Sequence, residues 1–211
     1  MSNPWLGVPL ADYEGHMDSP EVCQLAALSE LFAEALVLCR PESVAVLGIA
    51  GGNGLHHVDG AITKRVVGLD VNPSYLEAVR SRYAHKCLEL HCVDLAEQRV
   101  DLEPVQMVHA ALVFEHAGAS LCLENALSLV APGGALSVVL QLPTETGQNV
   151  SASRFPSMQT LKAEFSLVDP LWLRRTLAER AFRLTHETRR SLTAGKGFWM
   201  GIFDRQKNVS R

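Results

Sequence analysis

Residues 44–55 read Val44-Ala45-Val46-Leu47-Gly48-Ile49-Ala50-Gly51-Gly52-Asn53-Gly54-Leu55 and decide the fold. The unbroken apolar run 44–47 predicts a strand covered on both faces, as the strands of parallel sheets are. Glycines crowd the turn that follows, and they allow a ligand to approach the backbone closely. Apolar residues at helical spacing then predict a helix over 54–62, whose first amides are free to bind an anion.

A second apolar run, 66–69, is followed directly by Asp70. It predicts a second buried strand that carries a carboxylate at its end, where the carboxylate can accept hydrogen bonds from ribose hydroxyls. The strand, glycine turn, helix, strand and acid together predict a nucleotide-type pocket at the carboxyl edge of a parallel sheet.

The glycine spacing excludes two common nucleotide loops. The only Gly-x-Gly in this turn is Gly52-Asn53-Gly54, and His57 stands where a dinucleotide loop requires its third glycine. The turn contains no Gly-Lys-Ser or Gly-Lys-Thr, so it is not a Walker A loop. Because the turn has no lysine, we expect a less charged ligand than a triphosphate, such as a carboxylate held by helix amides.

Further landmarks follow this turn in a fixed order. They are Asp70-Val71-Asn72, Cys92-Val93-Asp94-Leu95, the strand-like run 105–112 and the turn Pro132-Gly133-Gly134. Over about residues 40–145 this ordered set resembles the class I S-adenosylmethionine-dependent methyltransferases. In the acid-x-Gly-x-Gly-x-Gly motif of that family, Gly48 stands at the acid and Ala50 at the first glycine, whereas Gly52 and Gly54 match.

The resemblance implies S-adenosylmethionine as the cofactor, with Asp70 on the ribose and Asp94 on the adenine amine. Since Gly48 replaces the acid, other residues would have to supply its usual contact near the methionine amino group. The cofactor-binding residues that the resemblance implies are Gly48, Ile49, Ala50, Gly52, Gly54, Asp70, Val71, Asn72, Asp94, Leu95, Ala110, Ala111 and Leu112.

Methyl transfer from a sulfonium requires alignment of the reactants more than a catalytic group, and a general base is needed only for a protonated acceptor. Glu115 and His116, just past the run 105–112, are candidates to accept that proton or to orient the acceptor. The alternative is that Glu115 and His116 are ordinary loop or helix-cap residues without a direct role. Tyr13 and His16, in the N-terminal arm, either contact the cofactor or pack the arm onto the core.

Composition limits the partners. The chain has 211 residues, a net charge of −4 and no basic run, which argues against nucleic acid as the main partner. Five cysteines without a Cys-x-x-Cys pair favour free thiols, and we expect a cytoplasmic protein because neither a signal peptide nor a membrane-spanning stretch is visible. No metal site is expected, since the adjacent His56 and His57 lack further ligands at suitable spacing.

We expect one domain with three regions: an N-terminal arm and helix at 1–40, a cofactor-binding core at 41–141, and substrate-side helices with closing strands at 142–211. Alternation of strands and helices predicts a parallel sheet. The expected strands lie near 44–48, 66–70, 87–92, 105–111, 135–141, 182–192 and 197–203. The expected helices lie near 19–40, 54–62, 73–84, 119–130, 158–164 and 169–180.

The resemblance implies an α/β fold, a three-layer αβα Rossmann-like sandwich. Its seven-stranded, mostly parallel sheet would have the order 3-2-1-4-5-7-6 with the last strand antiparallel. The predicted function is transfer of a methyl group from S-adenosylmethionine to a small-molecule acceptor. Two alternatives share the same core: a protein or RNA methyltransferase, and a non-catalytic protein that binds the cofactor or a partner. The sequence does not predict the oligomeric state.

Overall fold

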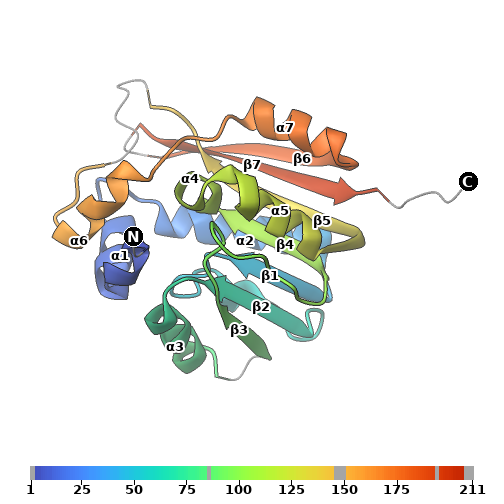
Figure 1. Ribbon diagram of the computed structural model, residues 1–211, viewed down its shortest axis with the longest axis horizontal. Coiled ribbons are helices and arrows are strands. Elements are labelled where there is room, and N and C mark those ends of the chain that lie inside the picture. Colours follow the sequence, from blue (N-terminus) through green and yellow to red (C-terminus); the bar gives the residue numbers. More distant parts are fainter. Residues whose placement is uncertain (1–2, 85–86, 145–150, 193–194, 207–211) are drawn as a thin grey trace, which may run out of the picture.

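The computed structural model describes residues 3–84, 87–144, 151–192 and 195–206. These residues form one seven-stranded sheet with the order β3-β2-β1-β4-β5-β7-β6 (Figure 1). The strands are β1 (Ser43–Leu47), β2 (Arg65–Asp70), β3 (Leu88–Cys92), β4 (Val105–Ala111), β5 (Val130–Gln141), β6 (Phe182–Ser191) and β7 (Gly197–Arg205).

Strand direction follows the prediction. β1 pairs in parallel with β2 and β4, while β7 runs antiparallel to both β5 and β6. The predicted strand order and the antiparallel last strand are therefore confirmed. The apolar run that predicted β1 lies at the centre of the sheet, and Val44, Ala45 and Leu47 are buried there.

Helices cover both faces of the sheet, which confirms the three-layer architecture (Figure 1). α2 (Leu25–Cys39) and α3 (Pro73–Arg82) contribute to the hydrophobic cluster on one face. α4 (Val113–Ala117), α5 (Ala119–Leu129) and α7 (Pro170–Glu179) contribute to the cluster on the other face. Because both faces are buried, the strand ends at the carboxyl edge are where a ligand can reach the backbone.

The prediction of a helix over 54–62 is wrong. Only a single 3₁₀ turn, η2 (Leu55–His57), forms there, and Val58 is already extended. Asp59 closes the next turn, since its side-chain Oδ1 accepts the Ala61 amide at 2.8 Å. The Asp59-Gly60 pair favours a turn, and this turn competes with helix formation. Leu55 and Val58 still reach the core, so the apolar spacing is satisfied without a helix.

The N-terminal region is more structured than the sequence indicates. η1 (Pro4–Gly7) and α1 (Leu10–Met17) form where a polar arm is expected, and α2 begins at Leu25 instead of near residue 19. The Ser19 carbonyl accepts the amides of Val22 and Cys23 in a turn, and Cys23 adopts a positive φ of 50° that a helix does not allow. α2 ends at Cys39, close to the predicted end.

Two smaller differences concern the second half of the chain. The single helix expected at 158–164 is split into α6 (Pro156–Gln159) and η3 (Thr160–Ala163), and β5 begins at Val130, five residues before its expected start. α1 and α6 lie side by side at one edge of the sheet (Figure 1), where Ser157 Oγ donates to Asp12 Oδ2 at 2.6 Å. No helix among the described residues is long and apolar enough to cross a membrane.

Candidate functional site

A cavity of about 170 Å³ lies at the carboxyl edge of the sheet, beneath η1 and α1. Its floor comes from four neighbouring strand ends. These contribute Gly48 and Ala50 after β1, Asp70 and Val71 at β2, Asp94 and Leu95 after β3, and Ala111 and Leu112 at β4. The topology thus brings together residues that lie as much as 64 positions apart, from Gly48 to Leu112, in the chain.

The remaining predicted residues divide into two groups. Tyr13, His16 and His116 also line the cavity. Ile49, Gly52, Gly54, Asn72, Ala110 and Glu115 do not line it. Asn72 contributes indirectly, since its side-chain Nδ2 donates to the Trp5 carbonyl at 2.9 Å and so holds the arm over the cavity.

The glycine turn is shaped by left-handed backbone. Gly54 has φ 84°, and a Cβ there would lie 2.9 Å from the Phe32 ring of α2. Gly48 has φ 64°, and Ala50 adopts φ 46° although it carries a side chain. The Ala50 amide donates to Asp70 Oδ2 at 2.9 Å, which ties the turn to the end of β2.

Asp70 is held by backbone amides in an almost solvent-free position. It is 7 % exposed, and its Oδ1 accepts the Asn72 amide at 2.9 Å. Burial raises the pKa of Asp70 to about 6, although the amide hydrogen bonds favour the charged form. Each carboxylate oxygen can accept a further hydrogen bond, so Asp70 retains acceptor capacity toward the cavity.

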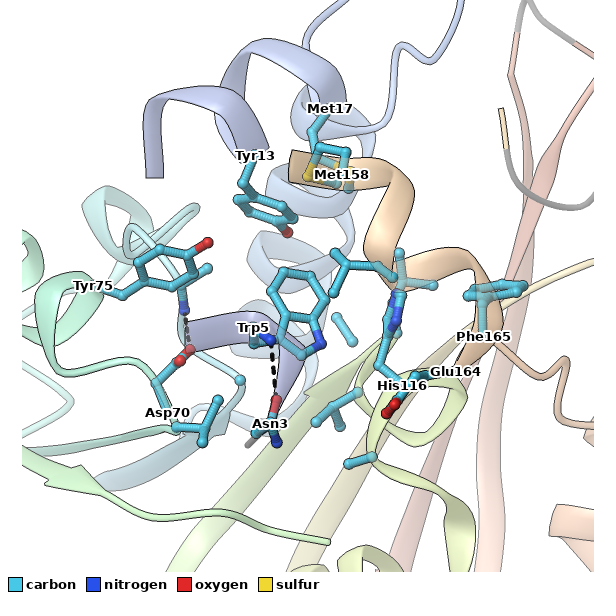
Figure 2. Close-up of a pocket in the computed structure, with 18 of the residues that line it drawn as sticks. Asn3, Trp5, Tyr13, Met17, Asp70, Tyr75, His116, Met158, Glu164 and Phe165 are labelled. Carbon is cyan, nitrogen blue, oxygen red and sulfur yellow. Dashed lines mark hydrogen bonds between the residues drawn. The ribbon is translucent and has the colours of Figure 1, made fainter. Parts of the chain in front are cut away.

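The N-terminal arm forms part of the cavity wall, where Asn3 and Trp5 are among the lining residues (Figure 2). Asn3 Nδ2 donates to Asp94 Oδ2 at 2.8 Å, and the Trp5 amide donates back to Asn3 Oδ1 at 3.1 Å. The Trp5 ring lies between Tyr13 and His116, with centroid distances of 5.7 and 5.0 Å. The arm is fixed further by Tyr75, whose hydroxyl donates to the Val8 carbonyl at 2.9 Å.

The two catalytic candidates differ in position. The His116 ring packs edge-on between Trp5 and Phe165, and burial lowers its pKa to about 4, so it is neutral near pH 7. Glu115 does not line the cavity, and its Oε1 accepts the Gln141 amide at 2.8 Å. Burial raises the pKa of Glu115 to about 7, and within the described residues neither its Oε2 nor His116 Nδ1 has a hydrogen-bond partner.

Several cavity residues were missed by sequence reasoning. Gln24, Gln141 and Lys196 come from the start of α2, the end of β5 and the hairpin before β7. All three are buried polar side chains, and that property is invisible in a sequence until the strand order is known. One wall of the cavity is built from α6, η3 and the segment after η3. Its residues are Met158, Leu161, Glu164 and Phe165. No cluster of three or more potential metal ligands occurs among the described residues.

Comparisons with known proteins match the fold. No family model matches the sequence, and none of the curated proteins does. Among solved structures, the N-methyltransferase NodS from Bradyrhizobium japonicum WM9, in complex with S-adenosyl-L-homocysteine, has a TM-score of 0.71 at 15% identity. That match covers 97% of this chain and 99% of the other.

Two further matches have related folds and different printed activities. The magnesium protoporphyrin IX methyltransferase ChlM from Synechocystis PCC 6803, with bound S-adenosyl-L-homocysteine, has a TM-score of 0.65 at 14% identity, and the match covers 85% of this chain and 82% of that one. The [4+2]-cyclase SpnF has a TM-score of 0.65 at 15% identity, with 86% and 82% covered. With the strand order β3-β2-β1-β4-β5-β7-β6, these matches show that the chain has the class I methyltransferase fold.

Proposed function

We propose that the chain binds S-adenosylmethionine in this cavity and transfers its methyl group to a small-molecule acceptor. The observation that carries the proposal is the convergence of Gly48, Asp70, Asp94 and Ala111 on one cavity at the carboxyl edge of the sheet. In doubly wound α/β folds this edge is where ligands bind. NodS and ChlM, which share the fold, are methyltransferases in complex with S-adenosyl-L-homocysteine, and their likeness supports the cofactor class.

The side chains in the cavity fit the adenosine part of the cofactor. Asp94 already accepts a hydrogen bond from the NH₂ group of Asn3, which is the interaction that an adenine amine would make. Asp70, at the end of the neighbouring strand β2, can accept hydrogen bonds from the ribose hydroxyl groups. The space is the limiting feature, because about 170 Å³ is less than the roughly 300–1,000 Å³ usual for ligand pockets. The arm must therefore move outward when the cofactor binds.

The bound cofactor supplies an electrophilic methyl group on a sulfonium. The protein's part is to align the acceptor with that methyl group and to exclude water. The apolar wall of Met158, Leu161 and Phe165 excludes water on the acceptor side. His116 is neutral near pH 7, and its buried Nδ1, which has no hydrogen-bond partner among the described residues, can accept from an acceptor N–H or O–H only after Trp5 moves away from its ring.

A non-catalytic role is the second candidate, and two observations favour it. Asn3 already makes a hydrogen bond to Asp94 at the cavity wall, and Gly48 and Ala50 depart from the acid-x-Gly motif. The fold does not determine the reaction, as the cyclase SpnF illustrates. Turnover of a panel of small nucleophiles separates the two candidates, whereas bulk RNA and protein in the same assay test the macromolecular alternative.

Asp70→Asn tests the cofactor assignment. It keeps the shape of the side chain and removes a charged hydrogen-bond acceptor, so we expect the dissociation constant for S-adenosylhomocysteine to rise at least about tenfold in calorimetry. Asp59→Asn, on an exposed turn, is the matched control and should bind as the wild type does. Failure of the wild-type protein to bind either S-adenosylmethionine or S-adenosylhomocysteine would refute the proposed function.

A further inference from the structure

Lys196 places a buried positive charge at the wall of the cavity. It lies in the hairpin between β6 and β7, where its carbonyl accepts the Leu192 amide at 2.8 Å. The next residue, Gly197, accepts the Leu142 amide at 2.8 Å, so the hairpin is fixed beside the end of β5. Lys196 is only 7 % exposed and lines the cavity.

The ammonium group has no partner within the described part of the chain. It makes no hydrogen bond there, and the carboxylates that line the cavity, Asp70, Asp94 and Glu164, form no ion pair with it. Burial of a charge costs free energy unless the charge is paired, and burial accordingly lowers the pKa of Lys196. A folded protein retains such a group most readily where a ligand supplies the missing partner.

Polar side chains surround this position. Burial lowers the pKa of His16, and the nearby charges of Lys196 and Lys162 lower it further. His16 and Lys196 both line the cavity, so these two groups share one end of it. Gln24 and Gln141 are buried in the same wall, and Gln24 Nε2 donates to Gln141 Oε1 at 3.3 Å. A wall with net positive charge and amide groups fits a carboxylate or a similar anion.

The strand order separates this wall from the adenosine side. Asp70 ends β2 and Asp94 follows β3, whereas Lys196 precedes β7, which lies four strands from β2 in the sheet. Neighbouring strands are about 4.8 Å apart, so the ends of β2 and β7 are separated by roughly 19 Å across the sheet. An anion beside Lys196 therefore belongs at the acceptor end of the cavity.

We propose that Lys196, with His16, Gln24 and Gln141 around it, forms a subsite for a carboxylate or related anionic group of the methyl acceptor. The acceptor is then a small organic anion. This inference rests on the proposed function, and it specifies the substrate class for the same cavity.

A panel of small organic acids tests the inference on the protein saturated with S-adenosylhomocysteine. The probes are benzoate, phenylacetate, 3-hydroxybenzoate, succinate and the corresponding primary amides. We expect at least one acid to bind wild-type protein about tenfold more tightly than its amide in calorimetry. Lys196→Met should abolish this preference, Lys196→Arg should retain most of it, and Lys64→Met, at an exposed lysine elsewhere, should leave it unchanged. If no acid is preferred over its amide, the inference is wrong.

A second measurement separates the acceptor from the cofactor as the source of the carboxylate. S-adenosylhomocysteine carries a methionine-type carboxylate, and 5′-methylthioadenosine does not. We expect Lys196→Met to bind both as the wild type does. Selective loss of S-adenosylhomocysteine affinity would assign Lys196 to the cofactor and overturn the acceptor assignment. If wild-type protein binds neither nucleoside, the proposed function itself fails, which is a different outcome.

Thermal unfolding of the free protein checks for a purely structural role. Since no described residue pairs with the Lys196 ammonium, Lys196→Met should leave the melting temperature unchanged or raise it. A clear fall in the melting temperature, with Lys64→Met unaffected, would mean that Lys196 stabilises the fold and would contradict its assignment as a ligand-binding residue.

Discussion

At the scale of single residues, the backbone of the glycine turn bears on both departures from the acid-x-Gly-x-Gly-x-Gly motif. Gly48 has φ 64°, a conformation that favours glycine, and a Cβ there would lie 3.3 Å from the Val113 side chain. Ala50 tolerates φ 46° at a cost of about 1–2 kcal/mol for a residue with a side chain. The left-handed backbone thus suits the glycine at position 48, whereas Ala50 carries strain that a glycine would relieve.

Substitutions at positions 50 and 48 of the turn should therefore change the free energy of unfolding in opposite directions. Ala50→Gly should raise the free energy of unfolding by about 0.5–1 kcal/mol, because relief of the left-handed strain exceeds the entropy that glycine adds to the unfolded chain. Gly48→Asp should lower it, and should not improve cofactor affinity. Denaturant titration measures both changes.

Gly60→Ala is a suitable control for these measurements. An added Cβ at Gly60 would meet nothing within 4 Å, and its φ lies outside the left-handed region. Its stability should stay close to that of the wild type. Equal stability of Ala50→Gly and wild type would argue against strain at this position.

At the scale of elements, the proposed function implies that the N-terminal arm and the cofactor compete for the same part of the cavity. Asn3, which caps η1, and Trp5 of η1 line the cavity, and α1 is tied to the glycine turn through Arg82, which pairs with Glu14 and donates to the Gly51 carbonyl at 3.1 Å. In that proposal the cofactor binds only the state in which Asn3 and η1 have moved aside, so its apparent affinity is reduced in proportion to the population of that state.

The two ends of the Asn3–Asp94 hydrogen bond should give opposite effects. Asn3→Ala removes the competitor, so the affinity for S-adenosylhomocysteine should rise about three- to tenfold. Asp94→Ala removes the group proposed to hold the adenine amine, so the affinity should fall. Calorimetry on both variants decides the matter. If both variants lose affinity, Asn3 is a cofactor ligand, and competition by η1 is refuted.

At the scale of the whole molecule, buried titratable groups link stability to pH. Burial raises the pKa of Asp70 to about 6 and that of Glu115 to about 7, above their values in the unfolded chain. Their contribution to stability is present below pH 4 and is lost as the pH rises through 6 to 7. The buried His16, His109 and His116 have lowered pKa values, and they act in the opposite direction as the pH falls below about 6.5.

A variant isolates one of these groups. Glu115→Gln cannot ionise, so its free energy of unfolding relative to wild type should increase between pH 4.5 and 7.5 by of the order of 2 kcal/mol. The histidines are common to both proteins and cancel in the difference. Denaturant titrations across this range measure it. A difference that does not change with pH would mean that Glu115 titrates normally.

The sequence by itself determined the sheet and its carboxyl edge. Unbroken apolar runs such as 44–47 are long enough to read without tertiary information, and the ordered motifs place Asp70 and Asp94 at neighbouring strand ends. Local apolar patterns were less informative about secondary structure where more than one backbone conformation buries the same residues. Leu55 and Val58 reach the core from one 3₁₀ turn and the residue after it, so the apolar spacing there did not require a helix.

Only the tertiary structure decided what fills and surrounds the cavity. Asn3 meets Asp94 across 91 positions of sequence, and Lys196 reaches the cavity because β7 is inserted antiparallel beside β5. Such contacts depend on strand order and on loop closure, which leave no periodic signal in the chain. Buried apolar runs therefore encode the framework, whereas the identity of the groups that line the cavity is decided only when distant segments are packed together.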